Sequence, residues 1–209
     1  ALCYFGEGTA SEGDFHVALN FAAVKKSQTI FFCRNNGFAI STRSSSQFAS
    51  YGIAERGIAY NMQSIRVDGN DPFAVYDAVR QARLACIAGE GPVLIEAMTY
   101  RTGPHSTSDD PSVYREKEET LSWEKELCPK VRLRNYLDSK DLWNDELEEQ
   151  TVADIKKEVD EAIDTARFTA PPEFESMIED VYFEVPSNLK KQLEEVAIAK
   201  EMEEESSDA

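Results

Sequence analysis

The fold is decided by the stretch LCYFGEGTAS, residues 2–11, in which a short apolar run leads into two glycines on either side of a glutamate. The apolar run at residues 2–5 predicts a buried β-strand, and residues 11–25 predict a helix directly after the glycine turn. Ser11 and Asp14 have the spacing of a capping pair at a helix start. The apolar face of this helix consists of Phe15, Leu19, Phe21 and Ala22.

The strand–helix pattern recurs along the first part of the chain. Apolar runs at residues 29–33, 64–67 and 93–100 predict further buried strands. Asp71 followed by proline predicts the start of another helix, which runs to about residue 88. Strands that alternate with helices at short spacing predict an α/β fold with a parallel sheet, in which ligands bind at the carboxyl ends of the strands.

The remainder of the chain has a different character. Residues 100–131 are polar and predict a long loop, a feature that in compact proteins is usually functional or disordered. Helical spacing returns further on, at Val152, Ile155, Val159 and Ile163 and again at Leu189, Leu193 and Val196. We therefore expect an α/β region over residues 1–135 and a helical segment over 136–209, whose acidic end at 201–209 frays.

The net charge of −17 lies almost entirely in that helical segment. Residues 136–209 carry 23 acidic and 7 basic side chains, against 16 and 15 in residues 1–135. An overall surplus of acids excludes a basic nucleic-acid binder, and no apolar run approaches the roughly 20 residues of a membrane span. We expect the acidic helices to pack on the sheet domain or on a partner subunit through Ile155, Val159 and Leu193, and to carry no chemistry.

The four cysteines are widely spaced and form no C-x-x-C pair, which favours free thiols in a reducing compartment over disulfides or a zinc site. Cys3 and Cys33 lie in apolar strand runs, where we expect them to be buried as small hydrophobic residues. The sequence opens on an apolar strand without a preceding methionine or targeting peptide, so we expect it to be part of a longer chain.

Glu7 is the residue that gives the first turn its chemistry. The turn is a near match to a dinucleotide-binding fingerprint, with Ser11 in place of the third glycine. Paired glycines let the backbone approach a diphosphate, and a helix N-terminus favours its charge. A carboxylate at Glu7 would repel phosphates unless a divalent cation lay between them, and magnesium characteristically joins protein carboxylates to phosphates.

The second strand ends in Arg34-Asn35-Asn36-Gly37-Phe38. Because a parallel neighbour would bring this end beside Glu7, the Asn36 side-chain oxygen and a carbonyl of the following turn could complete a metal shell. Arg34 would meet the phosphates as a permanently charged fork. A dinucleotide site would instead have an acid near this strand end, which argues against NAD. Each turn alone could be an ordinary α/β turn, but the 26 residues between the two motifs, 9–34, make the pair more specific.

The two motifs together resemble the magnesium–thiamine diphosphate motif of thiamine-dependent enzymes. Wider stretches, at residues 4–8 with 11–14, 31–42, 65–71 and 96–101, resemble the alpha subunit of the branched-chain 2-oxoacid dehydrogenase decarboxylating component. The resemblance is close over residues 2–135, continues more loosely to about residue 193, and corresponds to the C-terminal half of that subunit.

This resemblance implies a partial parallel-sheet thiamine diphosphate-binding α/β fold followed by a helical C-terminal segment. Magnesium would be held by Glu7, the Asn36 side chain and the Phe38 carbonyl. Phe38 stands where the family usually has tyrosine, and Thr9 where it has a smaller residue, but backbone ligands survive both changes. The implied cofactor-binding residues are Gly6, Glu7, Gly8, Thr9, Arg34, Asn36, Phe38 and His105.

Residues 101–116 resemble the phosphorylation loop of the same subunit. There His105 would face the cofactor and help to pass the acyl group to the lipoyl arm, as a histidine near its ordinary pKa can do. Without the resemblance, His105 would be interpreted as an ordinary surface histidine. Ser106 would be the kinase target, whereas the family's second modified serine falls at Glu116 and is absent. The implied loop-ordering residues are Arg101, Asp109, Tyr114 and Arg115.

The resemblance implies oxidative decarboxylation of branched-chain 2-oxo acids, with transfer of the acyl group to a lipoyl arm in the mitochondrial matrix. Implied partners are a beta subunit in a heterotetramer of two alpha and two beta chains, a lipoyl-bearing acyltransferase core, and a regulatory kinase and phosphatase, with no nucleic acid or membrane. Three alternatives stay open: a pyruvate dehydrogenase alpha subunit, a nicotinamide-dependent dehydrogenase and a non-catalytic interaction module.

Overall fold

The computed structural model describes residues 1–207 of the chain, which divide into two compact units. The first unit is Ala1–Asp145 and the second begins at Glu146. The boundary that we expected, between residues 135 and 136, lies inside helix α5 (Pro129–Asp138). Each unit is therefore described separately.

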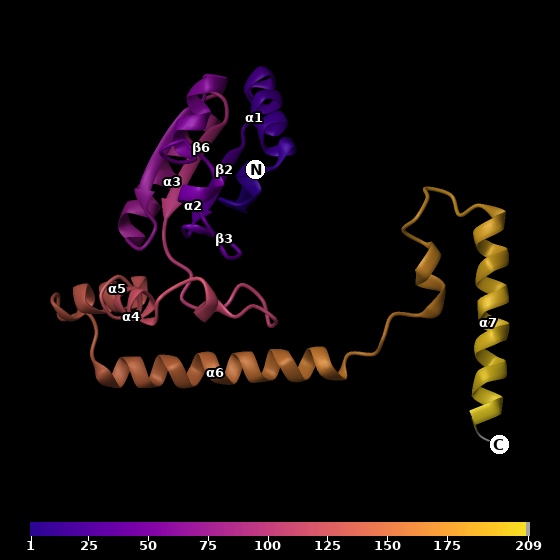
Figure 1. Cartoon of the computed structure of the whole chain (residues 1–209). Coiled ribbons are helices and arrows are strands. Elements are labelled where there is room, and N and C mark those ends of the chain that lie inside the picture. Colours follow the sequence, from indigo (N-terminus) through magenta and orange to yellow (C-terminus); the bar gives the residue numbers. More distant parts are fainter. Residues whose placement is uncertain (208–209) are drawn as a thin grey trace. The chain divides into compact units, whose positions relative to one another are not determined.

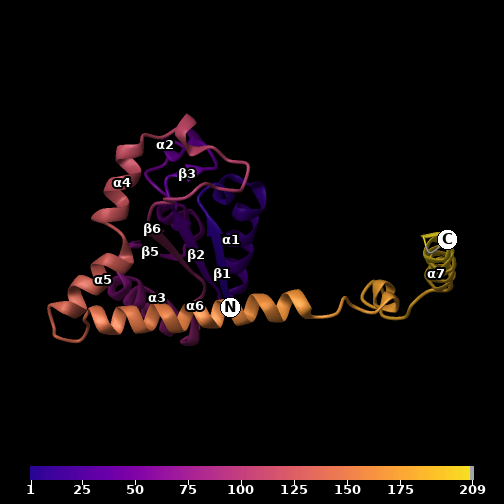
Figure 2. The ribbon, with the colours of Figure 1, turned by 90° about the horizontal axis from the view of Figure 1, so that it is seen from below.

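The first unit is built on a parallel sheet (Figure 1), whose four strands have the order β1-β2-β6-β5 (Figure 2), which confirms the predicted α/β class. Helices α1 (Gly13–Lys25) and α3 (Pro72–Ile87) lie on opposite faces of this sheet (Figure 2). The strands are β1 (Leu2–Gly6), β2 (Ile30–Asn35), β5 (Gln63–Asp68) and β6 (Val93–Met98).

Two apolar clusters, one on each face, form the core, because successive side chains of a strand point to opposite faces. The cluster on the α1 side consists of Ala10, Phe15, Leu19, Ala22, Phe31, Cys33, Ile53, Met62 and Leu94. The cluster on the α3 side consists of Ile30, Phe32, Ala82, Cys86, Val93, Ile95 and Ala97. The two central strands, β2 and β6, supply residues to both clusters, so their continuous apolar runs are buried as predicted.

The outer strands differ from the prediction. β1 pairs only with β2, and its side chains at Leu2 and Tyr4 are 44% and 64% exposed, so it is not the buried strand that we expected. Cys3 on the same strand is exposed rather than buried. An edge strand has one unpaired side and can leave a face uncovered, and a short apolar run does not reveal its position in the sheet.

The start of α1 also corrects the prediction. A 3-10 turn, η1 (Thr9–Ser11), separates the glycine pair from the helix, so the helix does not begin directly after the turn. Glu12 is the N-cap and makes no side-chain capping bond, which means that Ser11 and Asp14 do not form a capping pair. Phe21, expected on the apolar face, is 64% exposed.

Helix α3 begins as predicted. The Asp71 carboxylate accepts hydrogen bonds from the backbone amides of Phe73 and Ala74, at 3.0 and 3.2 Å. Pro72 takes the first helical position, where its missing amide proton leaves no intrahelical bond unmade.

The predicted long loop over residues 100–131 is wrong in part, because it contains α4 (Lys117–Lys125) and the start of α5. The side chains that hold α4 contact residues distant in sequence. Trp123 stacks on Tyr100 with ring centroids 5.1 Å apart, and Glu119 pairs with Arg43 at 2.9 Å. A helix that is held by contacts with distant residues needs no continuous apolar face, so its sequence shows little apolar periodicity. The other short elements are β3 (Phe38–Ala39), β4 (Thr42–Arg43), α2 (Ser44–Gln47), η2 (Ala54–Tyr60) and η3 (Pro111–Val113).

The second unit contains α6 (Asp145–Phe168) from its second residue onward, η4 (Phe174–Ile178) and α7 (Ser187–Ser207), which confirms the predicted helical segment. Val152, Ile155, Val159 and Ile163 on α6 are each between 50% and 57% exposed. Their packing on the sheet domain or a partner stays a prediction. The acidic end, expected to fray, is helical as far as residue 207, and residues 208–209 lie outside the described part. None of the helices within residues 1–207 combines the length and the apolar character of a membrane span.

Leu19 and Val17 on α1 test the assignment of the core. Leu19 is fully buried, so Leu19→Ala should lower the free energy of unfolding by about 2–5 kcal/mol. Val17, two residues away and 68% exposed, is the matched control. Val17→Ala should change the free energy of unfolding by less than about 0.5 kcal/mol. Urea unfolding followed by circular dichroism measures both, and equal losses would contradict this orientation of α1.

Candidate functional site

The carboxyl ends of all four strands meet at one edge of the sheet. Gly6 pairs in register with Arg34, and Met98 lies opposite both Asn35 and Asp68. Backbone bonds continue beyond the strands: the amide of Thr99 donates to the carbonyl of Asn35 at 2.8 Å. The segments that follow the strands are therefore held side by side, and they carry the site.

Glu7 and Asn36 are in direct contact at this edge. The backbone amide of Asn36 donates to Glu7 Oε2 at 3.0 Å, and the Asn36 side-chain amide lies 3.4 Å from the same oxygen. Glu7 is 1% exposed, although it follows an exposed edge strand. The proximity expected from two adjacent parallel strands is thus present.

Two oxygen atoms of this pair have no hydrogen-bond partner. Glu7 Oε1 and Asn36 Oδ1 are both buried and unpartnered. Burial raises the pKa of Glu7, while hydrogen bonds from backbone amides and the charge on Arg101 act in the opposite direction. Buried polar atoms are rarely left unsatisfied, and a carboxylate with an amide oxygen is a donor set that suits magnesium. The residues present therefore fit a hard divalent cation.

Such a cation would depend on a single carboxylate. Throughout residues 1–207 there is no group of three or more histidine, cysteine, aspartate or glutamate side chains placed to hold a metal ion. The rest of the coordination shell would have to come from neutral protein oxygens and from a ligand. Magnesium is bound in this way when it bridges protein carboxylates to phosphates.

A cavity of about 430 Å³ opens beside Glu7. It brings together every expected cofactor-binding residue except Arg34, together with Arg101 of the loop. Those that line it are Gly6, Glu7, Gly8, Thr9, Asn36, Phe38, Arg101 and His105. The other lining residues are Glu12, Ala39, Ile40 and Gln47.

Arg34 is placed differently. Its side chain is exposed and lines a neighbouring cavity of about 390 Å³. Gly6, Asn36 and Arg101 line both cavities, so Arg34 lies beside the first cavity rather than within it. The nitrogen Nε of Arg101 is buried without a partner, which leaves a cationic donor available to an anionic ligand.

The two glycines of the first turn have different structural roles. A Cβ at Gly6 would meet no atom within 4 Å, so this position leaves open space beside the backbone. A Cβ at Gly8 would lie only 3.0 Å from the Cβ of Ala39, so Gly8 is small because β3 approaches it closely. The expected approach of a diphosphate therefore concerns Gly6 at least as much as Gly8.

Arg115 organises the start of the 101–116 loop. It is 7% exposed, and its guanidinium donates to the carbonyls of Thr102 and Gly103 at 2.9 and 2.8 Å, and also to the carbonyl of Arg101. One buried cation thus binds three consecutive carbonyls and holds this segment in place.

A second set of contacts fixes the backbone at His105. Arg101 donates to the carbonyl of Ile40 at 2.6 Å and to the Tyr114 hydroxyl at 2.9 Å. Tyr114 in turn donates to Asp109 at 2.7 Å, and the same carboxylate accepts the His105 backbone amide at 2.7 Å. The four residues expected to order the loop thus belong to one connected network that ends on His105.

The side chains of Ser106 and Glu116 make no bond to this network, although the Ser106 carbonyl accepts the Asp109 backbone amide at 3.2 Å. Ser106 is exposed, and its hydroxyl is 3.3 Å from that of Ser108. Glu116 is exposed at the N-cap of α4 and makes no side-chain capping bond. Ser106 is accordingly accessible from solvent in this conformation.

Several residues that shape the site were not expected from the sequence. Tyr100 is one of them: its ring centroid lies 6.2 Å from that of Phe38, which also packs against Tyr114 at 5.7 Å. Asn35 and Glu96 are buried behind the Asn36 turn and bonded to each other at 2.7 Å. A charged residue in the middle of the apolar run at residues 93–98 was the available signal for Glu96.

Comparisons with known proteins identify the family that the chain resembles. A model of the family described as "Dehydrogenase E1 component" matches residues 1–175. The chain is 51% identical over 196 residues to 2-oxoisovalerate dehydrogenase subunit alpha, mitochondrial, of Pan troglodytes, covering 94% of this chain and 44% of that protein. It is 50% identical over 192 residues to subunit alpha 2 of Arabidopsis thaliana, covering 92% of this chain and 41% of that protein. The chain thus spans less than half the length of these relatives.

The Asp109 contacts predict how the loop responds to pH. Hydrogen bonds from the His105 amide and Tyr114 hydroxyl hold the pKa of Asp109 below its usual value. Because the folded-state pKa is lowered, the stabilisation is present above the ordinary value of about 4 and is lost as the pH falls through the lowered pKa. Exchange protection of the His105 amide should therefore be constant from pH 5 to 8 after correction for intrinsic rates.

Asp109→Asn should reduce that protection throughout pH 5 to 8, since it removes the charged acceptor. Asp110→Asn is the matched control, because Asp110 accepts from Ser112 at 3.0 Å rather than from His105. Hydrogen–deuterium exchange read by mass spectrometry measures both. A loss of wild-type protection between pH 7 and 5 would contradict the assignment to Asp109.

Proposed function

The chain belongs to the dehydrogenase E1 component family, and we propose that it provides the metal- and diphosphate-binding half-site of a thiamine diphosphate-dependent dehydrogenase alpha subunit. The reaction is the oxidative decarboxylation of branched-chain 2-oxo acids, with transfer of the acyl group to a lipoyl arm. The observation that carries the proposal is the pair of buried, unpartnered oxygens on Glu7 and Asn36. The names of the relatives support the branched-chain substrate class.

The residues around the cavity have distinct roles in this proposal. Magnesium would be held by Glu7, the Asn36 side chain and the Phe38 carbonyl. Gly8, Thr9 and Arg34 would bind the diphosphate. When bound, thiamine diphosphate supplies the stabilised carbanion on which decarboxylation depends, while the protein binds and orients it.

His105 is the proposed catalytic residue of this chain. It lines the same cavity as Glu7, and its backbone is fixed by Asp109. An imidazole can hold or release a proton near neutral pH, so it can serve the transfer of the acyl group to the lipoyl arm. Asp109 and the residues bonded to it act through His105 by keeping its backbone in place.

Ser106 is the proposed regulatory site, modified by a kinase and restored by a phosphatase. Its hydroxyl is exposed and adjacent to His105. A phosphate on Ser106 would place a charge of about −2 close to Asp109, whose carboxylate accepts the His105 amide. Repulsion would then disorder the loop that must receive the lipoyl domain. Because Glu116 replaces the second serine, regulation in this chain rests on one site.

The site needs a partner to function. We propose a beta subunit in a heterotetramer of two alpha and two beta chains, docked on a lipoyl-bearing acyltransferase core in the mitochondrial matrix. The mitochondrial relatives support this location. Their 2-oxoisovalerate specificity favours the branched-chain subunit over a pyruvate dehydrogenase alpha subunit. Glu7 and the run Arg34-Asn35-Asn36 argue against a nicotinamide-dependent enzyme.

A titration of the assembled protein with thiamine diphosphate tests the proposal. We expect binding that requires magnesium, and no saturable binding of NAD. Glu7→Gln should weaken magnesium-dependent binding by more than about 100-fold, since a residue behind the ligands is already worth about 10–100-fold. Glu12→Gln is the matched control, because Glu12 lines the same cavity but is exposed. Tight binding of NAD, or equal effects of the two substitutions, would contradict the proposal.

His105→Asn should separate the two halves of the reaction. Decarboxylation measured with an artificial electron acceptor should persist, whereas acylation of the lipoyl domain should fall by about 10²–10⁴-fold. His16→Asn is the control, because His16 contacts Tyr60 at 2.9 Å and lies outside the cavity. Equal loss in both assays would show that His105 is needed for the fold or for cofactor binding instead.

A further inference from the structure

Glu96 is a fully buried carboxyl group in the middle of the sheet. It lies on the central strand β6, opposite Cys33 in the register with β2, and is 0% exposed. Its neighbours Leu94 and Ile95 are also fully buried. A charge in such a place is unfavourable unless it is paired and hydrogen-bonded, so the contacts of Glu96 require an explanation.

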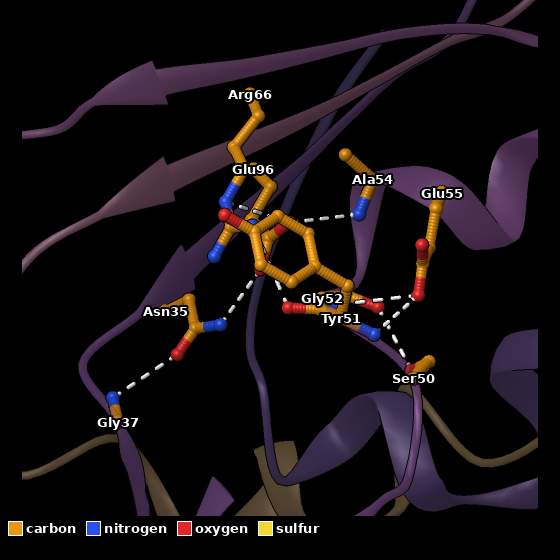
Figure 3. Close-up of polar contacts among 9 residues, drawn as sticks. All are labelled: Asn35, Gly37, Ser50, Tyr51, Gly52, Ala54, Glu55, Arg66 and Glu96. Carbon is orange, nitrogen blue, oxygen red and sulfur yellow. Dashed lines mark hydrogen bonds and ion pairs between the residues drawn. The ribbon is translucent and has the colours of Figure 1, made fainter. Parts of the chain in front are cut away.

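Three segments of the chain converge on this carboxylate (Figure 3). Glu96 Oε1 accepts a hydrogen bond from the side-chain amide of Asn35 at 2.7 Å. Glu96 Oε2 accepts from the backbone amide of Ala54 at 2.9 Å and forms an ion pair with Arg66 Nε at 3.8 Å. Each oxygen therefore faces donors only.

The surroundings are shaped to admit this carboxylate. A Cβ on Gly52 would lie 2.7 Å from Glu96 Oε2, so only glycine leaves room there. Arg66 is held in position by Tyr51, whose ring lies 4.4 Å from the guanidinium carbon (Figure 3). The site is built from strands β2, β5 and β6 and from the segment that enters η2.

Asn35 connects Glu96 to the turn that presents Asn36. Its nitrogen Nδ2 donates to Glu96, and its oxygen Oδ1 accepts the backbone amide of Gly37 at 3.0 Å (Figure 3). Gly37 has a φ of +84°, a conformation that other residues rarely adopt. The Asn35 side chain thus braces the turn from below, one residue before Asn36.

The orientation of the Asn35 amide follows from the chemistry of Glu96. An ionised carboxylate only accepts hydrogen bonds, so the NH₂ group of Asn35 must face it. The Asn35 oxygen then necessarily faces Gly37, where it meets a donor. The opposite orientation would place the NH₂ group against the Gly37 amide and an oxygen against a carboxylate. Glu96 therefore selects the orientation that bonds the turn.

We propose that Glu96 is a positioning residue for the metal-binding turn: through the Asn35 amide it fixes Gly37, and so holds Asn36 in contact with Glu7. This inference rests on the proposed function, in which Asn36 binds magnesium. It explains why a charged group occupies the centre of an apolar strand, and why its partners are all hydrogen-bond donors.

Exchanging the polarity of the bond between residues 96 and 35 tests the proposal. In Glu96→Gln, two donors face Oε2, so the new carbonyl remains there and the new NH₂ group turns to Asn35. Asn35 must then rotate its amide and present a donor to the Gly37 amide. We expect the Gly37 amide to exchange about tenfold faster, as for the loss of one hydrogen bond. The magnesium dissociation constant at saturating thiamine diphosphate should rise about 10–100-fold.

Adding Asn35→Asp to Glu96→Gln should restore both quantities. The aspartate oxygens can accept from the introduced amide and from the Gly37 amide together, and the total charge returns to that of the wild type. We expect recovery to within about threefold, which is the signature of a direct pairwise interaction. Asn35→Asp alone should be impaired, because it sets two carboxylates against each other.

Glu55→Gln is the matched control. Glu55 lies on the same segment as Ala54 and accepts the backbone amides of Tyr51 and Gly52, but it has no contact with Asn35 (Figure 3). This variant should leave Gly37 exchange and magnesium affinity unchanged. All measurements use the full-length subunit assembled with its partner.

The outcomes are separable. Unchanged Gly37 exchange in Glu96→Gln, or a double variant impaired by the sum of the single effects, overturns the proposal. If Glu96→Gln does not fold, recovery of folded protein by Asn35→Asp supports it and failure to recover overturns it. If the wild type binds no thiamine diphosphate with magnesium, the proposed function fails, while the exchange measurements without cofactor still decide the role of Glu96.

Discussion

The parallel pairing of β1 with β2 is the constraint on which the rest of the structure depends. In this register Gly6 lies opposite Arg34, so the residues that follow each strand emerge together at one edge. Glu7 consequently meets Asn36, although 28 residues separate them in sequence. Because of this pairing, the turn after β1 and the turn after β2 line the same cavity. The loop after β6 also contributes to its lining. A shift in the register would separate all of these groups at once.

Two buried carboxyl groups, Glu7 at this edge and Glu96 within the sheet, differ in how their oxygens are satisfied. Both oxygens of Glu96 have protein partners, whereas Glu7 Oε1 has none, and Asn36 Oδ1 is also unpartnered. Burial raises the pKa of the Cys33 thiol, and the charges on Glu96 and Glu7 act in the same direction. Glu96 therefore holds the turn that positions Asn36, and Asn36 in turn contacts Glu7. The carboxylate of Glu96 is tolerated in the interior because hydrogen-bond donors and a cation surround it.

Much of the fold and the site could be predicted from local patterns. The buried strands β2 and β6 and the Asp71-capped helix follow from runs and spacings that span a few residues. The association of Glu7 with Asn36 follows from strand order and the geometry of parallel sheets. Other features have no local cause. The exposure of β1 reflects its edge position, and α4 is held by Tyr100 and Arg43 from elsewhere in the chain. A polar helix whose contacts are all with distant residues has no local apolar pattern, so its sequence predicts a loop.

By itself the sequence determined the α/β class, the two motifs and the residue types available for a cation and a diphosphate, because strands, turns and helices depend on near neighbours. Only the tertiary structure decided which oxygens are left without partners, that Arg34 lies beside the cavity instead of in it, and that Gly8 is small to accommodate Ala39. It also decided the orientation of the Asn35 amide, through an acceptor on a strand more than 60 residues away. Hydrogen-bond direction and close packing are properties of groups that meet in space, and a linear pattern does not contain them.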